Sequence, residues 1–285
     1  MGLWRNIWEI LDMIKIGHSV LALPFAFMGA MLAARGWPDG HTTFFILLAM
    51  VSARSAAMAF NRLADAVFDA ANPRTATRSL PQGRLKQGPV IIFTIINSLI
   101  FIWAAAQLNR VCLFLSFPAL AVILGYSLSK RFTAASHFIL GLGLSLAPVG
   151  GWLAVRGDLS LQVLVLAGSV LFWVAGFDIL YALQDEEFDR RAGLWSLPAR
   201  VGASWSRRLA AGCHLLAAAG FLWTGRLAGL QGVYTGAALF GAGILGAQHF
   251  ILSLPGERQL PPAFFTLNGL VGVGLGLATW LSLIS

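Results

Sequence analysis

Nine apolar stretches, each long enough to cross a lipid bilayer as a helix, most constrain how this 285-residue chain can fold. The hydrocarbon core of a bilayer is about 30 Å thick, and a helix needs roughly 20 apolar residues to cross it. Stretches such as 89–108 do not alternate apolar and polar residues as the strands of a membrane barrel do. The sequence therefore predicts an all-α, polytopic membrane bundle of about nine transmembrane helices around a central cavity. The expected spans are 17–36, 42–61, 89–108, 111–128, 134–155, 159–183, 206–225, 228–252 and 262–284.

The composition supports a membrane protein of one domain. Hydrophobic residues make up 58% of the chain and charged residues only 11%, whereas about a quarter of the residues of a soluble protein are charged. The apolar stretches follow one another without a linker or a low-complexity segment. We therefore expect residues 1–285 to form a single membrane-embedded domain.

Lys and Arg are distributed unequally between the two sides of the predicted bundle. Fifteen of the 20 lie in the N-terminal segment or near the loops that follow every second span, four lie on the other side, and Arg54 lies inside a span. Because cytoplasmic loops are enriched in Lys and Arg, we expect the N-terminus and the longest loops to face the cytoplasm, in the inner (cytoplasmic) membrane. This bias and an anionic substrate or lipid account for the net charge of +8, with no nucleic-acid motif and no obligate protein partner indicated.

A first group of polar residues recurs at helical spacing. Asn61, Asp65 and Asp69 are four residues apart, and Arg54 lies seven residues before Asn61, so one helical stripe carries a cation, an amide and two carboxylates. Ionisable groups in a bilayer normally face the interior of a bundle because facing lipid costs several kcal/mol. The stripe is expected to face a cavity, with a purely structural set of salt bridges as the alternative.

A second stripe lies at the end of the sixth span. Asp178, Tyr181, Asp185 and Asp189 follow one another at offsets of three, four and four residues. Mg²⁺ prefers a few carboxylate oxygens together with the phosphate oxygens of a substrate, so two such stripes on the same side of the membrane predict a magnesium site. For Asp178 two interpretations remain open: a direct role with substrate, or a buried ion pair with Arg54.

Two clusters of cations accompany the acidic stripes. Arg74 and Arg78 lie in a loop rich in Pro and Gly after the first stripe, and Tyr126, Lys130 and Arg131 lie between the fourth and fifth spans. Guanidinium groups bind phosphate oxygens in bidentate fashion, and lysine acts on the same groups as a point charge. Either cluster alone is typical of cytoplasmic loops. Next to carboxylates, the two together indicate a site in which a diphosphate is held jointly by a metal ion and by basic side chains.

These motifs, in this order, resemble the UbiA superfamily of intramembrane prenyltransferases, which join an isoprenoid diphosphate to an acceptor that is often aromatic. The resemblance covers nearly the whole chain and is closest to the 4-hydroxybenzoate polyprenyltransferase group, on Asn61-Arg62 and the segments 15–19 and 196–200. Arg62 stands where the commonest form of the first motif has an acid, which removes one potential metal ligand. The motifs are Asn61-x-x-x-Asp65-x-x-x-Asp69, Arg74-Thr75-x-x-Arg78-x-x-Pro81-x-Gly83, Tyr126-x-x-x-Lys130-Arg131 and Tyr181-x-x-x-Asp185-x-x-x-Asp189.

The resemblance implies a Mg²⁺-dependent transfer of a polyprenyl group from an isoprenoid diphosphate to an aromatic acid in quinone biosynthesis. The acid is 4-hydroxybenzoate or a dihydroxynaphthoate-type acid. The implied metal ligands are Asn61, Asp65, Asp69, Asp185 and Asp189, and the implied diphosphate-binding residues are Arg74, Arg78, Lys130 and Arg131. The implied catalytic residues are Lys130, which stabilises the leaving diphosphate, Tyr126 and Tyr181, which stabilise an allylic cation, and Asp65 or Asp185, which takes up the ring proton. Arg54, Asp178 and His18 are expected to bind the acceptor.

Two other classes of function remain open. One is a UbiA-type enzyme with a different acceptor, such as a glycerol phosphate or a chlorophyll or haem precursor, or a terpene cyclase. The other is a cation-coupled transporter. Because a transporter places its ionisable groups near the bilayer midplane, and here they gather at one membrane face beside loops rich in arginine, the sequence favours an enzyme.

Overall fold

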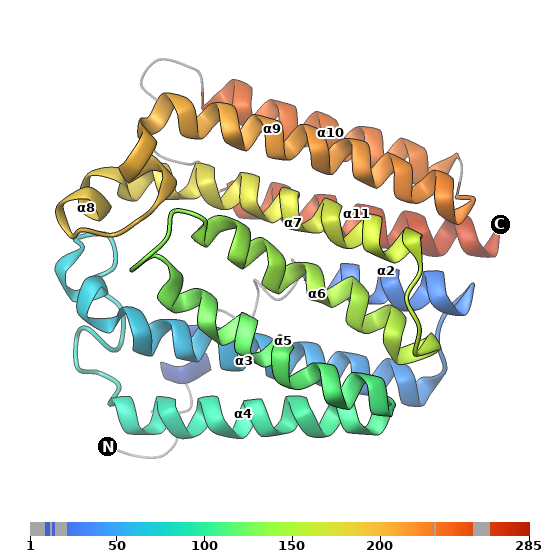
Figure 1. Cartoon of the computed structure of the whole chain (residues 1–285), viewed down its shortest axis with the longest axis horizontal. Coiled ribbons are helices and arrows are strands. Elements are labelled where there is room, and N and C mark those ends of the chain that lie inside the picture. The colour runs from blue at the N-terminus through green and yellow to red at the C-terminus, as the bar shows by residue number, and fades with distance from the viewer. Residues whose placement is uncertain (1–8, 12, 15–21, 231, 253–262) are drawn as a thin grey trace.

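The computed structural model describes residues 9–11, 13–14, 22–230, 232–252 and 263–285, and across these ranges the chain forms helices and no strand (Figure 1). Most of the long helices lie roughly along the long axis of the molecule. The helices in chain order are α2 (Leu23–Ala34), α3 (Gly40–Ala71), α4 (Gln87–Leu108), α5 (Arg110–Ser129), α6 (Ser136–Arg156), α7 (Leu161–Ala182), the short α8 (Glu186–Arg191), α9 (Leu197–Ala228), α10 (Val233–Ile251) and α11 (Ala263–Ile284). A 3-10 turn over Leu183–Asp185 lies between α7 and α8.

The predicted all-α membrane bundle is confirmed, and each expected span overlaps mainly with one helix. Among the described residues, six segments are long and apolar enough to cross a membrane: α3, α4, α5, α6, the stretch Leu161–Arg191 and α11. The described part of α2 is shorter than a full span, and α9 and α10 do not meet the same limits of length and hydropathy. The chain is therefore a multi-pass membrane protein for which the expected count of nine spans is approximate.

Helix α3 continues well beyond the predicted end of its span at residue 61. Its first turn is capped by Asp39, whose Oδ1 accepts a hydrogen bond from the Thr42 amide at 3.0 Å, which satisfies a donor that the helix itself leaves unpaired. The helix ends at Ala71, and Asn72 is extended as the residue before Pro73 must be. The apolar stretch stops before the helix does, so the whole first acidic stripe is carried on one rigid element.

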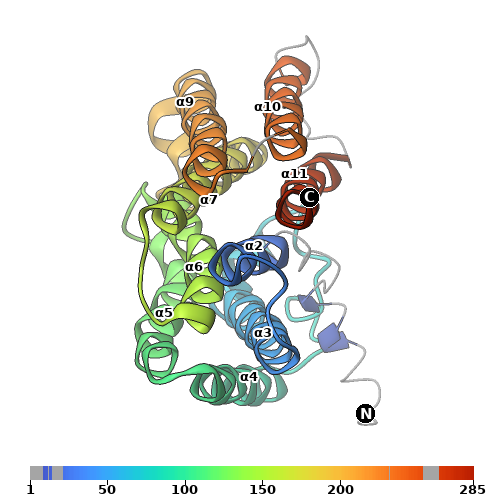
Figure 2. The same cartoon turned by 90° about the vertical axis from the view of Figure 1, so that its right-hand side faces the viewer.

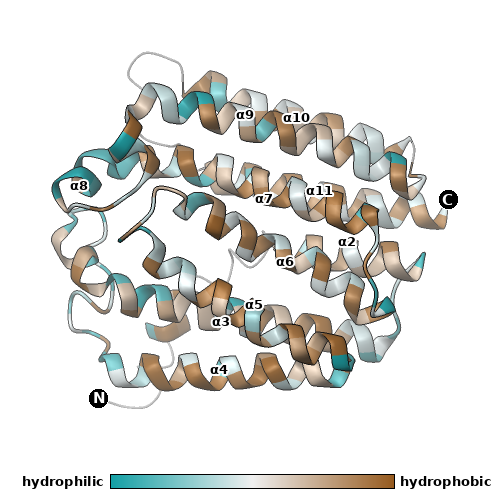
Figure 3. Ribbon diagram, in the orientation of Figure 1, coloured by the Kyte–Doolittle hydropathy of each residue, from teal (hydrophilic) through white to brown (hydrophobic). Residues whose placement is uncertain are grey.

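Polar segments gather at one end of the bundle, which we call the polar end and define as residues 61–86, 130–135 and 185–196. In Figure 3 hydrophilic colours are concentrated around α8 and the neighbouring loops, whereas the long helices are mostly hydrophobic. The two acidic stripes and the loops rich in arginine therefore meet at the same end of the molecule.

The apolar core lies around α7, which packs between α6 and α9 (Figure 2). Phe25 of α2 lies against Trp173, with ring centroids 5.1 Å apart, and stacks on Phe221 at 5.8 Å. The Trp173 indole donates a hydrogen bond to the side-chain oxygen of Asn268 on α11 at 3.0 Å, so its one polar atom is satisfied inside the core. This core makes α7 a fixed wall from which the second acidic stripe projects.

Glycines allow α2 and α6 to approach closely. A Cβ atom added to Gly151 would lie 1.9 Å from the Ala26 carbonyl oxygen, and one added to Gly29 would lie 2.0 Å from that of Pro148. On the other side of α6, a Cβ at Gly141 would lie 2.4 Å from the Leu171 carbonyl oxygen. Close approach at small residues is typical of helix packing in membranes, and here it fixes α6 against both α2 and α7.

Candidate active site

A cavity of about 780 Å³ runs from the polar end into the bundle between α3, α4, α5, α6 and α7. Both acidic stripes and both cation clusters line its polar end. Its deeper part is lined by apolar side chains, and it reaches Leu108 and Cys112, near the junction of α4 and α5. The cavity therefore joins a charged compartment to a long apolar one.

The first stripe faces this cavity, as predicted. Arg54, Asn61, Asp65 and Asp69 all line it from α3. The Asn61 amide donates a hydrogen bond to Asp65 Oδ2 at 3.0 Å, which holds the Asp65 carboxylate against its own helix and leaves its other oxygen available. The helical spacing of these residues is thus what brings them to one wall.

The second stripe faces the cavity from the opposite side, although the helix beneath it is not continuous. Asp178 and Tyr181 belong to α7, Asp185 ends the 3-10 turn, and Asp189 lies on α8. The tighter turn changes the direction of the chain, but all four side chains still line the cavity. The four residues therefore share one face, as their spacing predicted, although the backbone that carries them is not one continuous helix.

Two arginines of the loop after α3 hold carboxylates of both stripes. Arg78 donates from one guanidinium nitrogen to both oxygens of Asp69 at 2.7 Å. Arg74 donates from Nε to Asp185 Oδ1 at 2.9 Å, bonds Asp185 Oδ2 through Nη2, and donates to the Tyr181 hydroxyl at 2.8 Å. The loop thereby joins the two walls of the charged compartment.

Lys130 lies among carboxylates just after the end of α5. Burial alone would lower the pKa of its ammonium, but the surrounding charges of Asp178, Asp189, Asp185 and Asp65 raise the pKa above its ordinary value. Its backbone carbonyl accepts a hydrogen bond from the Trp195 amide at 2.6 Å. The side chain is therefore a fixed positive charge that lines the cavity.

Arg131, next to it, has a different environment from that of Lys130. Its guanidinium donates to the Ala64 carbonyl oxygen at 2.5 Å and lies 5.5 Å from the centroid of the Phe68 ring. Both contacts are on α3, so Arg131 ties the end of α5 to the helix of the first stripe. It still lines the cavity, where its guanidinium, which carries five N–H donors, could bond a diphosphate as well as the Ala64 carbonyl.

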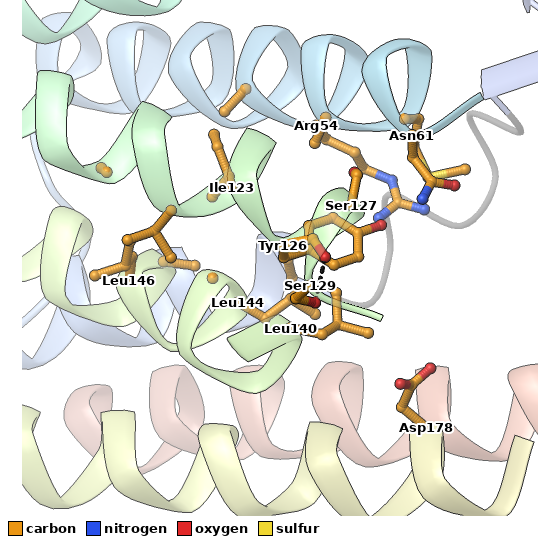
Figure 4. A pocket seen from close by; sticks show the side chains of 18 of the residues that line it. Arg54, Asn61, Ile123, Tyr126, Ser127, Ser129, Leu140, Leu144, Leu146 and Asp178 are labelled. Carbon is orange, nitrogen blue, oxygen red and sulfur yellow. Dashed lines mark hydrogen bonds between the residues drawn. The ribbon is translucent and has the colours of Figure 1, made fainter. Parts of the chain in front are cut away.

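Arg54 and Asp178 reach into the cavity from opposite walls, α3 and α7, and the Tyr126 ring lies beside the Arg54 guanidinium (Figure 4). The alternative interpretation, an ion pair between Arg54 and Asp178, is wrong. Asp178 instead pairs with His137 of α6, with Nδ1 and Oδ2 2.6 Å apart. Arg54 Nε is buried and has no hydrogen-bond partner among the described residues. The third expected acceptor residue, His18, lies outside the described residues.

The structure adds three polar residues that the sequence alone did not single out as part of the site. Arg62 lines the cavity close to the carboxylates of the first stripe. Asn72 donates to Asp185 Oδ1 at 3.0 Å, and His137 bonds Asp178. A histidine inside an apolar span is itself a signal of function, so His137 was identifiable in principle. The bond made by Asn72 depends on the path of a loop and was not.

The charged compartment provides the donors that a magnesium ion needs. Asp65, Asp69, Asp185 and Asp189 supply carboxylate oxygens from two walls, and Asn61 supplies an amide oxygen, all hard ligands of the kind that Mg²⁺ prefers. Asp189 Oδ2 is buried without a hydrogen-bond partner in the described part of the chain. Within that part no three acidic, His or Cys side chains are grouped closely enough to hold an ion without rearrangement. The residues fit the metal in chemistry and position, once Arg74 and Arg78 turn away from their carboxylates.

Comparison with known proteins agrees with the geometry. The chain matches the UbiA prenyltransferase family over residues 22–270. It is 29% identical to a 4-hydroxybenzoate octaprenyltransferase of Hydrogenovibrio crunogenus, over 94% of this chain and 95% of that protein. Its fold is similar to that of a UbiA homolog from Aeropyrum pernix K1 in the apo state, with a TM-score of 0.84, 32% identity, and coverage of 92% of this chain and 97% of that chain.

A second solved structure shares the fold at lower identity. A UbiA homolog from Archaeoglobus fulgidus bound to DMAPP and Mg²⁺ superposes with a TM-score of 0.75 and 16% identity, over 96% of this chain and 99% of that chain. The family match extends over most of the chain and includes both acidic stripes and both cation clusters. This chain belongs to the UbiA prenyltransferase family.

Proposed function

We propose that this protein transfers a polyprenyl group from an isoprenoid diphosphate to the ring of an aromatic acid, and that the acid is 4-hydroxybenzoate. The observation that carries the proposal is the shape and charge of one cavity. Cations and carboxylates meet at its polar end, and an apolar arm leads from them into the bundle. A molecule with a diphosphate head and a hydrocarbon tail matches both compartments.

The diphosphate would bind at the polar end. Arg74 and Arg78 would turn from Asp185 and Asp69 to its oxygens, and Lys130 would supply a fixed positive charge with Arg131 next to it. Guanidinium and ammonium groups aimed at the leaving oxygens stabilise the charge that develops on them as the carbon–oxygen bond breaks. Mg²⁺, held by Asp65, Asp69, Asp185 and Asp189 with help from Asn61, would supply Lewis-acid stabilisation of the same charge when bound.

The prenyl chain would occupy the apolar arm. Ile123 of α5 and Leu140, Leu144 and Leu146 of α6 line the arm in Figure 4. Breaking the carbon–oxygen bond leaves an allylic cation, which must be kept from water. The faces of Tyr126 and Tyr181, which both line the cavity, can stabilise such a cation through their π-electrons.

The acceptor would lie between the walls of α3 and α7. The buried Arg54, whose Nε has no partner in the described residues, would bind its carboxylate, and Asp178 would face its hydroxyl group. The ring carbon ortho to the hydroxyl forms the new carbon–carbon bond, and the proton on that carbon leaves to restore aromaticity. Asp65, Asp185 or the released diphosphate would take up that proton. His18 is a further proposed contact with the acid.

We place the protein in the inner membrane with the polar end toward the cytoplasm. Support comes from the excess of Lys and Arg on that side, since such an excess is typical of cytoplasmic loops. A dihydroxynaphthoate-type acid is the second candidate acceptor, because it presents the same carboxylate and hydroxyl groups on a larger ring. The substrates and the lipid bilayer are the partners that this proposal requires.

The test is an assay in proteoliposomes with geranyl diphosphate and Mg²⁺, supplied with 4-hydroxybenzoate or with 1,4-dihydroxy-6-naphthoate. We expect a prenylated product from 4-hydroxybenzoate that disappears with EDTA and in Asp65→Ala. Product from the naphthoate alone would reassign the acceptor. Diphosphate release without either product would indicate another acceptor or a cyclase. No diphosphate release under any condition would contradict the proposal and favour a transporter.

A further inference from the structure

His137 is completely buried on α6, behind the wall of the cavity, and does not line the cavity itself. We infer that His137 is a positioning residue: it holds the Asp178 carboxylate in one orientation and in its charged form, so that Asp178 accepts a hydrogen bond from the hydroxyl of the aromatic acid. The inference rests on the proposed function for the identity of the acid. The hydrogen bonds that carry it are properties of the chain alone.

Two hydrogen bonds define the protonation of His137. The Leu197 backbone amide donates to His137 Nε2 at 3.3 Å. A backbone N–H is always a donor, so Nε2 must be the ring nitrogen without a proton. The proton of the neutral ring is therefore on Nδ1, which donates it to Asp178 Oδ2 at 2.6 Å. In this arrangement the imidazole is neutral and Asp178 is an anion.

The bond from Leu197 also fixes the start of α9. Leu197 is the first residue of that helix, and the first amides of a helix have no partner within it. Immediately before it, the Trp195 amide donates to the Lys130 carbonyl oxygen at 2.6 Å. Residues 195–197 thus hold the backbone of Lys130 and, through His137, the side chain of Asp178.

The orientation of Asp178 determines what it offers to the cavity. With Oδ2 engaged by His137, the other carboxylate oxygen remains for a ligand, opposite Arg54 on α3 (Figure 4). An acid whose carboxylate and hydroxyl lie at opposite ends of the ring would direct one group to each of these walls. Accepting the hydroxyl hydrogen bond increases the electron density of the ring, which favours attack by the ortho carbon.

Without His137, two other outcomes are open to Asp178. The Lys130 ammonium is a positive group that acts on Asp178, so a released carboxylate can turn toward Lys130 and away from the acceptor. It can also take up a proton, because a lone carboxylate in the wall of an apolar cavity is costly. In either case the protein loses the acceptor contact but keeps the diphosphate site.

Two substitutions separate the contacts of His137. His137→Asn places an amide nitrogen near the position of Nδ1 and keeps a donor for Asp178 but loses the acceptor for Leu197. His137→Gln places its amide near Nε2 and keeps an acceptor for the Leu197 amide but loses the donor to Asp178. The wild type, both variants and Asp178→Asn are assayed in proteoliposomes with Mg²⁺, geranyl diphosphate and 4-hydroxybenzoate, with KM measured for each substrate and thermal unfolding midpoints in detergent.

We expect His137→Gln and Asp178→Asn each to raise the KM for the acid by roughly tenfold, because a hydrogen bond to a charged group is lost. The KM for geranyl diphosphate should stay within about twofold, a change of less than half a kcal/mol. His137→Asn should keep the acid KM close to that of the wild type while lowering the unfolding midpoint. Equal defects in Asn and Gln, a larger defect in Asn, or equal effects on both substrates would overturn the inference. A wild type that prenylates no aromatic acid would instead contradict the proposed function, and with it the role given to Asp178.

Discussion

Arg74 and Asp185, 111 residues apart in the sequence, form a two-point ion pair at the polar end, with Nε donating to Oδ1 at 2.9 Å. The same guanidinium donates to the Tyr181 hydroxyl and lies 5.2 Å from the centroid of that ring. The pair closes the charged compartment between the loop after α3 and the second stripe. In the proposed reaction, a diphosphate and its metal would compete with this internal ion pair, and Arg74 and Asp185 would each exchange one partner for another when substrate binds.

The first prediction concerns that guanidinium. Arg74→Lys keeps the charge but cannot make the two-point contact, so we expect the KM for geranyl diphosphate to rise by about tenfold with a smaller effect on the acid. Arg84 is a matched control in the same loop, because it is exposed and donates to the Thr77 carbonyl oxygen, away from both acidic stripes. An Arg84→Lys variant as impaired as Arg74→Lys would show that general charge in the loop is what matters.

Metal dependence should be centred on Asp189, whose Oδ2 is buried and has no hydrogen-bond partner among the described residues. We expect EDTA to abolish prenyl transfer and Asp189→Asn to raise the Mg²⁺ concentration for half-maximal activity by roughly tenfold, since the amide loses the charge that attracts the cation. Glu187→Gln is the control, because Glu187 is exposed and pairs with Arg191 on the outside of α8. The readouts are activity against Mg²⁺ concentration and Mg²⁺-induced thermal stabilisation in the presence of inorganic diphosphate. Unchanged Mg²⁺ dependence in Asp189→Asn would remove Asp189 from the ligand set.

Arg54 is predicted to select the acid. Arg54→Ala should raise the KM for 4-hydroxybenzoate by tenfold or more, about 1.4 kcal/mol for each factor of ten, while leaving that for geranyl diphosphate nearly unchanged. Arg110→Ala serves as the control, because Arg110 is an exposed arginine at the start of α5. Parallel losses for both substrates would mean that Arg54 supports the shape of the cavity and does not bind the carboxylate.

The apolar arm should limit the length of the prenyl chain at Gly143. Gly143 and Ile123 both line the cavity, and a Cβ atom added to Gly143 would lie in contact with Ile123 Cγ2, at 3.6 Å. The larger side chain of Gly143→Leu would fill space that a long tail needs. We expect the ratio of octaprenyl to geranyl transfer to fall by about tenfold, and Gly168→Leu, where a new side chain meets open space on α7, to leave it unchanged. An unaltered ratio in Gly143→Leu would place the tail elsewhere.

A fifth prediction concerns stability. Gly151→Ala would bring a Cβ to 1.9 Å from the Ala26 carbonyl oxygen, forcing α2 and α6 apart at a cost of about 1–3 kcal/mol, as overpacking does in well-packed interiors. Gly168→Ala has room for its methyl group and should be neutral or slightly stabilising, because alanine favours the helix. Thermal unfolding in detergent compares the two. Equal midpoints would show that the contact between α2 and α6 is easily displaced.

The arrangement of the two stripes followed from the sequence, because spacings of three, four and seven residues place side chains on one face of a helix. Asn61, Asp65 and Asp69 reach the cavity for that reason alone. The break in the second stripe at Leu183–Asp185 was not predictable, since a 3-10 turn and an α-helical turn differ too little over three residues to disturb the pattern. Helix α3 is longer than its predicted span because its last turns, after residue 61, carry polar and charged residues that end the apolar stretch but not the helix.

The hydrogen-bond partners of side chains on different helices were harder to predict than the residues that share one face of a helix. Asp178 pairs with His137 and not with Arg54, although all three lie within or beside the same cavity. Sequence spacing carries no information about which of two neighbouring helices lies nearer, and the close approach of α6 to α7 is set by glycines such as Gly141. The contacts of Arg74 depend likewise on the path of the loop that begins at Asn72.

The cavity is charged at one end and apolar along the rest of its length. One leaflet of a lipid bilayer changes in the same order, from charged headgroups to apolar acyl chains. An amphiphile that moved from the leaflet into such a cavity would keep its head among ions and its tail among hydrocarbon at every stage. The solvation free energy of the amphiphile would therefore change little on entry. The interactions that the site makes with its head could then serve to stabilise the transition state in which the carbon–oxygen bond breaks.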